Sequence, residues 1–410
     1  MRKVLLINSV IYVPGEGGYK RTLYLFDYLK KLGYTVTLLT SDFNHYSKQK
    51  RDISAFRKDY PDYENIEFLS LAPYKRNISI KRYFSELKYK KVVKKWVEEN
   101  IDKYDVVYVS MPEIPTILGI KDVVNKKRIP MIIDVRDLRP EALRVVLKNE
   151  LVYRIATYYM KLQANIAYAS ADELVAVSQE YLDRALSVNR YSKNPKVVYI
   201  GSIIEKFDKG VKKYSDYITV GKDEFYLIYA GTIGASYDLE TLVLAMEELQ
   251  KRNQKNIKLR ILGQGPNENS LKALCKDRNI NNVEFIGFVD YEEMAAYLSK
   301  SHVAINALKA RGSQSIINKV ADYLSAGIPM LSSSIKPEMK KLISINEVGI
   351  NYEPEDVIGL ADAIEYLHDN PDVRKAMGIK ARNLALSKFN RETTYYELVK
   401  TIEEVEWHIK

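Results

Sequence analysis

The sequence predicts an α/β protein made of two Rossmann-like, doubly wound domains that face a central cleft. Its length of 410 residues fits two domains better than one. Short apolar runs alternate with amphipathic helical segments, which is typical of parallel sheets covered by helices. The same alternation begins a second time after a polar, charged stretch at 206–222, so the pattern indicates two sheets.

In the first half, a glycine-rich loop follows the first apolar run and leads into a helical pattern that Gly33 ends. Apolar runs of four or five residues recur after it and are bounded by turn residues or helices. We therefore expect parallel strands at 4–7, 35–39, 106–109, 131–133 and 174–177.

The second half repeats this order with glycine-rich turns after its strands. We expect strands at 225–230, 259–262, 283–286, 302–307 and 329–331, and helices at 239–249 and 316–325. The predicted division is a first domain at 1–205, a linker at 206–222, a second domain at 223–390, and a C-terminal helix at 391–410 that packs back on the first domain.

The composition excludes several classes of protein. With 46% hydrophobic and 28% charged residues, the chain can form a core and is not disordered. A single cysteine cannot form an internal disulfide, and the four histidines lack metal-ligand spacing, so we expect a reduced compartment and no zinc site. No signal peptide and no run of about 18 apolar residues is evident, which predicts a cytoplasmic protein that is at most peripheral on a membrane.

The charge is uneven along the chain. The overall charge of +10 is concentrated in residues 1–200, whereas residues 201–410 are nearly neutral. Segment 75–95 holds nine basic residues with interleaved aromatic residues, and segment 143–160 adds apolar and basic residues. This pattern favours docking on an anionic membrane surface. No nucleic-acid-binding motif accompanies the charge, so we expect no nucleic acid partner.

Two loops have compositions suited to an anionic ligand. Gly17 and Gly18 lie between the first strand and the first helix, where glycine permits close backbone approach and a helix N-terminus favours an anion. The spacing is not that of a dinucleotide site, and an ordinary strand–helix turn is the alternative. In the second half, Gln314, Asn318 and Asp322 are four residues apart, so we expect them to share one face of a helix.

That predicted helix face combines donors near the helix start with a carboxylate two turns further on. A nucleotide-sugar needs both, because its phosphates accept hydrogen bonds and its ribose hydroxyls donate them. A capped amphipathic helix without a ligand is the alternative interpretation of the same residues.

The ordered landmarks resemble one family. Segments 134–141 (Asp-Val-Arg-Asp-Leu-Arg-Pro-Glu), 230–234, 261–266, 285–287 and 318–329 (beginning Asn-Lys and ending Ala-Gly-Ile-Pro) resemble the GT-B glycosyltransferases of family 4, of the bacterial capsule and O-antigen type. The resemblance implies a retaining enzyme that moves a sugar from a nucleotide-sugar donor to a lipid-linked or oligosaccharide acceptor in surface polysaccharide synthesis. It implies no metal and no other cofactor, and a place on the inner face of the cell membrane.

The resemblance also assigns roles to residues. Catalysis, by stabilising the departing diphosphate, would rest on Lys319, Arg311 and Asp137. Arg136 and Glu141 would face the acceptor. The donor-binding residues would be Gly17, Gly18, Gly231, Thr232, Gly263, Phe288, Gln314, Ser315, Asn318 and Asp322.

The chain departs from the family at several of these positions. Gln314 and Asp322 stand where the family carries two glutamates, and Thr232 and Tyr237 stand where an arginine and a lysine often hold phosphate. Two other functions therefore stay open. One is a non-catalytic homologue that binds nucleotide-sugar or acts as a partner subunit, and the other is a nucleotide-sugar epimerase, which would need a histidine in its site.

Overall fold

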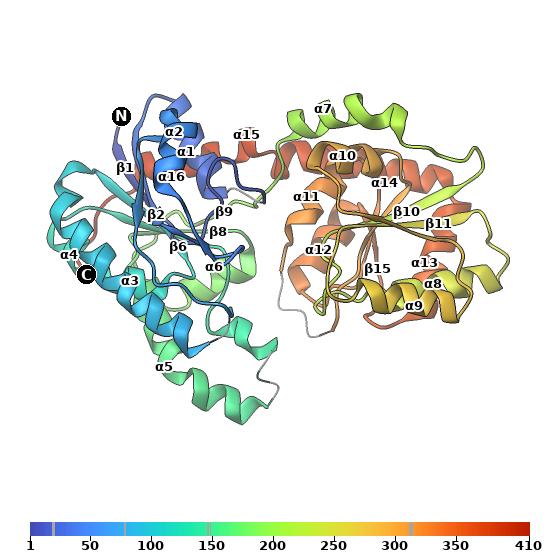
Figure 1. Ribbon diagram of the computed structural model, residues 1–410, viewed down its shortest axis with the longest axis horizontal. Coiled ribbons are helices and arrows are strands. Elements are labelled where there is room, and N and C mark those ends of the chain that lie inside the picture. The colour runs from blue at the N-terminus through green and yellow to red at the C-terminus, as the bar shows by residue number, and fades with distance from the viewer. Residues whose placement is uncertain (19–20, 78, 146, 148, 311–314) are drawn as a thin grey trace. The chain divides into compact units, whose positions relative to one another are not determined.

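The computed structural model describes residues 1–18, 21–77, 79–145, 147, 149–310 and 315–410. The chain forms two compact units (Figure 1). The first comprises residues 1–198 and 395–410, and the second comprises residues 199–394. Each unit has a parallel β-sheet with helices packed on it, so the α/β class and the two Rossmann-like domains are confirmed.

The sheet of the first unit has seven strands in the order β5-β2-β1-β6-β7-β8-β9, and every neighbouring pair is parallel. Its central strands are continuous apolar runs because helices cover both faces. The strands are β1 Lys3–Ile7, β2 Thr35–Ser41, β5 Ile66–Leu69, β6 Val106–Met111, β7 Met131–Val135, β8 Glu173–Ala176 and β9 Lys196–Val197. A small antiparallel pair, β3 Phe43–Asn44 and β4 Gln49–Lys50, follows β2.

The helices of the first unit connect these strands. They are α1 Arg21–Lys31, α2 Ile53–Asp59, α3 Ile80–Asn100, α4 Ile114–Lys126, α5 Glu150–Ala169, α6 Gln179–Leu186 and α16 Tyr396–Glu404, with short 3-10 turns η1 Pro61–Tyr63, η2 Ile101–Lys103 and η3 Glu141–Val145. The last helix belongs to this unit because Leu398, Val399 and Ile402 pack into the same core as β1, β2 and α1.

The second unit has a six-stranded parallel sheet in the order β12-β11-β10-β13-β14-β15. Its strands are β10 Phe225–Ala230, β11 Ile257–Leu262, β12 Val283–Gly287, β13 Val303–Asn306, β14 Met330–Ser332 and β15 Gly349–Asn351. The first strand of each unit therefore lies in the interior of its sheet, and the order of later strands reverses beside it. In such sheets a ligand binds at this reversal, beyond the carboxyl ends of the strands.

Two apolar clusters, one containing α8 and α13 and the other α10 and α11, form the core of the second unit. Its helices are α7 Ile204–Tyr214, α8 Leu239–Lys251, α9 Glu268–Asp277, α10 Tyr291–Ser299, α11 Asn318–Ser325, α12 Pro337–Asn346, α13 Val357–Asp369, α14 Pro371–Leu384 and α15 Arg391–Thr394, with a 3-10 turn η4 Ser215–Tyr217 and a π turn η5 Ala385–Phe389.

The expected linker at 206–222 is wrong for most of its length. Residues 204–214 form helix α7, which packs against α10, and the division between the units falls at 198/199 instead of 205. Ile204, Phe207 and Gly210 are buried at helical spacing among charged side chains. That narrow apolar stripe is enough to hold a helix on the second unit.

Among the described residues, no helix is both long enough and apolar enough to cross a membrane.

Candidate functional site

In the second unit, three glycine-containing loops meet at the carboxyl ends of β10, β11 and β12. The Gly231 N–H donates to Leu262 O at 2.9 Å, and the Gly263 N–H donates to Gly287 O at 2.7 Å. A Cβ atom at Gly263 would overlap the carbonyl oxygen of Gly231. Both glycines have positive φ angles, so only glycine lets these loops approach so closely.

Lys319 lies against this loop cluster from the first turn of α11. Its side chain is buried, and its Nζ lies 3.8 Å from the centroid of the Tyr229 ring and 4.1 Å from that of Tyr237. Among the described residues, no acceptor forms a hydrogen bond with Nζ. Burial lowers the pKa of Lys319 well below its usual range. A buried amine that only aromatic faces accompany is well suited to meet an anion.

The structure brings three of the predicted donor-binding residues to Lys319. Gly231 is adjacent, since a Cβ there would lie 2.7 Å from Lys319 Nζ. Gly263 lies against Gly231 and is therefore close to Lys319 as well. Asn318 is the first residue of α11. The N-cap residue Ile317 has no side-chain acceptor, so it does not cap the backbone N–H groups of the first turn.

Ser315 and Asp322 are committed to contacts within the second unit. The Ser315 hydroxyl donates to Glu338 Oε2 at 3.1 Å. Asp322 is buried, and its Oδ1 accepts a hydrogen bond from the Tyr291 hydroxyl at 2.9 Å. Contact of Asp322 with ribose stays a prediction, and it would require this side chain to become accessible.

Two further predicted residues lie at the rim. Thr232 is exposed, and its carbonyl oxygen accepts from the Tyr229 hydroxyl at 2.7 Å. Phe288 follows β12, and 70% of its surface is exposed. An exposed aromatic side chain beside a glycine loop offers a flat surface on which a base can stack.

Arg311 and Gln314 lie outside the described residues. The helix that was expected to carry Gln314, Asn318 and Asp322 on one face begins only at Asn318. Ile317 has extended backbone, so the four-residue spacing places only Asn318 and Asp322 on one face of α11.

In the first unit, the predicted glycine loop follows β1. Gly18 has a φ of +107°, and a Cβ there would overlap the Tyr12 ring, whereas Gly17 is exposed with open space around it. Arg51 holds the preceding turn, because it donates to Ile11 O at 2.7 Å and pairs with Glu16 at 2.8 Å. The loop is thereby presented at the carboxyl end of β1.

The two acceptor-side residues and the predicted catalytic residue Asp137 lie in segment 136–141, and their contacts differ. Arg136 Nη1 donates to Thr22 Oγ1 at 3.0 Å, and the exposed Asp137 accepts from the backbone N–H of Leu138. Both follow β7 at the carboxyl edge of the sheet. Glu141 instead forms an ion pair with Arg184 at 2.5 Å, which ties η3 to α6. Glu141 therefore holds η3 and α6 together, and its contact with an acceptor stays a prediction.

Glu113 was not among the residues predicted from the sequence. It lies between β6 and α4, as the N-cap residue of α4. One of its carboxylate oxygens accepts from the Ser9 backbone N–H, and the other is buried without a partner among the described residues. Burial raises the pKa of Glu113 to about 7. Since β1 and β6 are neighbours at the reversal of the strand order, Glu113 occupies the ligand-binding position of this sheet.

A second feature that the sequence did not reveal is a basic cluster, consisting of Lys48, Arg82 and Arg139 around His45 and Tyr74. Arg82 and Arg139 both contact one acid, Glu86, at 2.7 and 3.1 Å. Burial, together with the nearby charges of Arg82, Lys48 and Arg139, lowers the pKa of His45 to about 3. Asp137 also lies near Arg82 and Arg139, and Glu113 lies near Tyr74, so the three cations and these acids form a mixed charged cluster.

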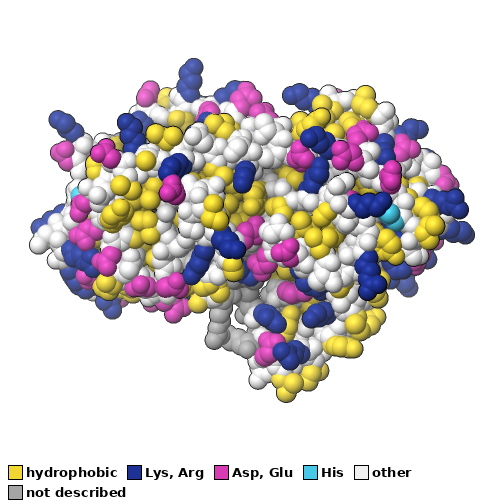
Figure 2. Space-filling view, turned by 180° about the vertical axis from the view of Figure 1, so that it is seen from behind, with side chains coloured by type: hydrophobic (Ala, Val, Ile, Leu, Met, Phe, Trp, Pro, Cys, Tyr) yellow, Lys and Arg dark blue, Asp and Glu magenta, His cyan; other side chains and the backbone are white. Residues whose placement is uncertain are grey.

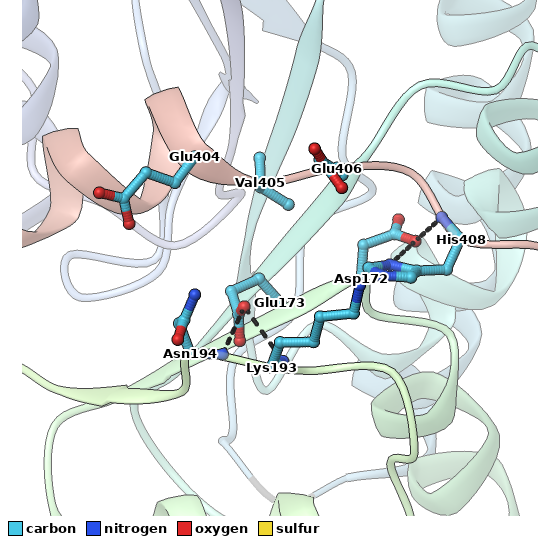
Figure 3. A pocket seen from close by; sticks show the side chains of 8 residues that line it. All are labelled: Asp172, Glu173, Lys193, Asn194, Glu404, Val405, Glu406 and His408. Atoms are coloured by element: carbon cyan, nitrogen blue, oxygen red, sulfur yellow. Dashed lines mark hydrogen bonds and ion pairs between the residues drawn. The ribbon is translucent and has the colours of Figure 1, made fainter.

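A small pocket elsewhere in the first unit lies beside the start of β8 and is not part of this edge (Figure 3). The buried Asp172 accepts from the His408 N–H at 2.9 Å and pairs with Lys410 at 2.8 Å, and Glu173 accepts from the Asn194 N–H at 3.0 Å. These contacts fasten the last residues onto the first unit.

Within the described part of the chain, no three His, Cys, Asp or Glu side chains gather where they could hold a metal ion. Independence from a metal stays a prediction.

Comparison with known families and proteins bears on the second unit first. Residues 210–384 match the family described as "Glycosyl transferases group 1". This segment contains α11 with Lys319 and the glycine loops after β10, β11 and β12.

Curated relatives have similar names at low identity. An uncharacterized glycosyltransferase of Methanocaldococcus jannaschii is 24% identical over 64% of this chain and 66% of its own length. The capsular polysaccharide biosynthesis glycosyltransferase CapM of Staphylococcus aureus is 21% identical over 90% of this chain and 94% of its own. The matches to the first three relatives span only between 46% and 66% of those proteins.

Among solved structures, HepE of Anabaena in complex with UDP has a TM-score of 0.70 at 14% identity, with 98% of this chain and 99% of that chain covered. This likeness shows the fold. Together, the family match and the relatives support the expectation that the chain is an enzyme of the transferase class.

Proposed function

We propose that the protein is a glycosyltransferase of family 4 that takes its sugar from a nucleotide-sugar. The observation that carries the proposal is the buried Lys319 amine, which lies against Gly231 at the carboxyl end of β10 and has no hydrogen-bond partner in the part of the chain that the structure describes. The family match over residues 210–384 and the UDP bound to HepE support a nucleotide as the ligand.

In this proposal the second unit binds the donor. The glycine loops let the diphosphate approach the backbone, and the N-terminus of α11 and Lys319 supply positive charge. Phe288 lies at the rim, where a base could stack. The diphosphate would provide the anion that Lys319 lacks in the absence of a ligand.

The chemistry needs charge stabilisation at the departing diphosphate. As the bond from the sugar to the diphosphate breaks, negative charge grows on the phosphate oxygen, and a buried cation stabilises that charge more strongly than water does. Holding the acceptor hydroxyl near the anomeric carbon lowers the activation barrier further through proximity. Attack on the face that the diphosphate leaves gives retention of configuration.

The first unit would bind the acceptor. The basic cluster of Lys48, Arg82 and Arg139 supports an acceptor that carries phosphate, as a lipid-linked sugar does, and Glu113 can hydrogen-bond a sugar hydroxyl.

The name of CapM, a capsular polysaccharide glycosyltransferase, supports a role in surface polysaccharide synthesis. A peripheral position on the inner face of the cell membrane belongs to the same proposal, because an acceptor linked to lipid is held there.

The test measures donor binding and turnover separately. UDP, GDP and TDP, and then their sugars, are titrated into the protein by calorimetry, and radiolabelled donors are incubated with membrane extract. We expect one nucleotide to bind and its labelled sugar to enter the lipid fraction. Interconversion of the free donor would instead support the epimerase, and binding without transfer would support the non-catalytic homologue.

A matched pair of variants locates the donor site. Lys319→Met should abolish transfer, whereas Lys341→Met, which removes an exposed lysine from α12 of the same unit, should leave it unchanged. Equal rates for both variants would contradict the assignment of the donor site to the start of α11.

A further inference from the structure

Helix α5 has an unusual distribution of side chains for a helix at a protein surface. Its inner face is buried through Tyr153, Thr157, Ala164 and Tyr168, at helical spacing. A surface helix normally presents charged and polar residues on the opposite face. The opposite face of α5 is instead apolar over its whole length.

Large apolar side chains make up this outer face. Ile155 is 71% exposed, Leu151 is 68% exposed and Tyr158 is 66% exposed. All seven members recur at spacings of three, four or seven residues and share one side of the helix. We call this set the α5 stripe: Leu151, Val152, Ile155, Tyr158, Tyr159, Leu162 and Ile166.

Basic residues accompany the stripe. On α5, Arg154 and Lys161 are exposed and lie along one flank of the apolar residues, and Arg154 also pairs with Glu150 at 3.0 Å. In Figure 2, hydrophobic and basic side chains gather together on the lower edge of the molecule, where Figure 1 places α5.

Helix α3 adds further charge and aromatic surface. Phe84 is 56% exposed near its start, and Lys88 and Lys91 are exposed beyond it. Lys75 and Lys81 of the same segment are exposed too, whereas two other lysines of α3 have contacts within the first unit. Lys90 packs on Gly119, and Lys94 lies 3.6 Å from Glu98.

We propose that the α5 stripe inserts into the interfacial region of an anionic lipid bilayer. The stripe supplies buried apolar area, and Arg154 and Lys161 lie beside it where they meet anionic headgroups. The basic residues of segment 75–95 favour the same anionic surface, and the exposed apolar side chains of α5 add a face that can insert into it.

The charge pattern favours a bilayer over a second copy of the chain as the occupant. In a symmetric dimer formed through the α5 stripe, Lys161 would find no available acid on the partner's α5, because Glu150 is the acid of this helix and already pairs with Arg154. An anionic bilayer matches both the apolar face and its basic flank. The tyrosines Tyr158 and Tyr159 also suit the headgroup level, since each has an apolar ring and a polar hydroxyl.

The inference extends the proposed function but does not depend on it, because vesicle binding is measured without donor or acceptor. The full chain is co-sedimented with vesicles of phosphatidylglycerol and phosphatidylcholine, and with phosphatidylcholine alone. We expect binding to the anionic vesicles, and a loss of at least tenfold in the variant Leu151→Asp, Ile155→Asp, Leu162→Asp. A reporter variant, Tyr158→Trp, should show a blue shift of emission on binding.

The control carries the same three changes at exposed isoleucines of the second unit, Ile345→Asp, Ile358→Asp and Ile379→Asp, and should bind as the parent does. Equal binding by both triple variants, or no blue shift, would overturn the proposal. A further result would overturn it: the parent is a dimer in sedimentation, the α5 triple variant is a monomer, and neither protein binds vesicles. Loss of glycosyl transfer with intact vesicle binding would contradict the proposed function and leave this inference standing.

Discussion

Lys319 and Gly231 are in contact at the carboxyl end of β10, where a Cβ on the glycine would lie 2.7 Å from the lysine Nζ. The glycine gives the lysine side chain its space, and the surrounding Tyr229 and Tyr237 rings give it no hydrogen-bond acceptor. Such an arrangement is unfavourable for the free protein, because a buried cation without a partner lowers the stability of the folded state. It is favourable once an anion arrives.

The first prediction is that Lys319→Met weakens nucleotide-sugar binding while it stabilises the protein. A charge-assisted hydrogen bond contributes about 1.5–3 kcal/mol, so affinity should fall roughly ten- to a hundredfold. The pKa of Lys319 lies below its usual value of 10.5, so at intermediate pH the unfolded chain binds more protons and the parent becomes more stable as pH rises. The gain in Tm for the variant should therefore be larger at pH 6 than at pH 9.

Calorimetry and thermal unfolding of the same preparations check this prediction. Unchanged affinity in the folded variant would move the phosphate contact elsewhere, with Arg311 as the next residue to test.

The strands and the glycine landmarks could be predicted from the sequence because they depend on local pattern. The strand at 225–230 has the expected bounds, and Gly231, Gly263 and Lys319 come together as an ordered set of motifs should. Helix α7 was missed because its buried residues are few among many charges.

The acceptor-side features could not be predicted in the same way. Glu113 belongs to no motif, and its raised pKa arises from burial beside Ser9, which lies about a hundred residues earlier. The basic cluster likewise forms only when the segments after β2, β5 and β7 come together. Segment 143–160 has apolar residues on more than one side of the helix. Its periodicity therefore could not tell which apolar side would be buried and which would stay exposed.

The second prediction concerns Glu113. Its pKa of about 7 exceeds the usual 4.5, so between these values the folded protein binds more protons than the unfolded chain. The stabilisation from the protonated form is present below pH 4.5 and is lost as pH rises through 7. Glu113→Gln keeps the group neutral, and its Tm should exceed that of the parent more at pH 8 than at pH 5.

Thermal unfolding of parent and variant across that pH range is the measurement, with Glu99→Gln, an exposed change on α3, as the control. A constant difference in Tm at all pH values would mean that Glu113 titrates normally.

The third prediction separates two roles for Asp322. Because the buried Asp322 carboxylate accepts from the hydroxyl of the half-buried Tyr291, Asp322→Ala should lower the free energy of unfolding by about 1–3 kcal/mol. Tyr291→Phe should reduce stability through the same contact, and the two effects should be less than additive. Denaturant unfolding measures both. If Asp322→Ala left stability unchanged and reduced nucleotide affinity, the side chain would be a ribose ligand instead.

The last prediction concerns the ion pair of Arg21 and Asp134, which joins the start of α1 to β7 at 2.9 Å and is almost wholly buried. Removing one partner leaves an uncompensated buried charge, so Asp134→Ala should lower the free energy of unfolding by about 3–5 kcal/mol. The double variant Arg21→Met, Asp134→Leu should recover much of that loss, because it buries apolar groups of similar volume. Asp122→Ala, at an exposed pair, should change stability by less than about 0.5 kcal/mol. A double variant whose loss equals the sum of the losses measured for Arg21→Met alone and Asp134→Leu alone would show that the two side chains stabilise the first unit independently.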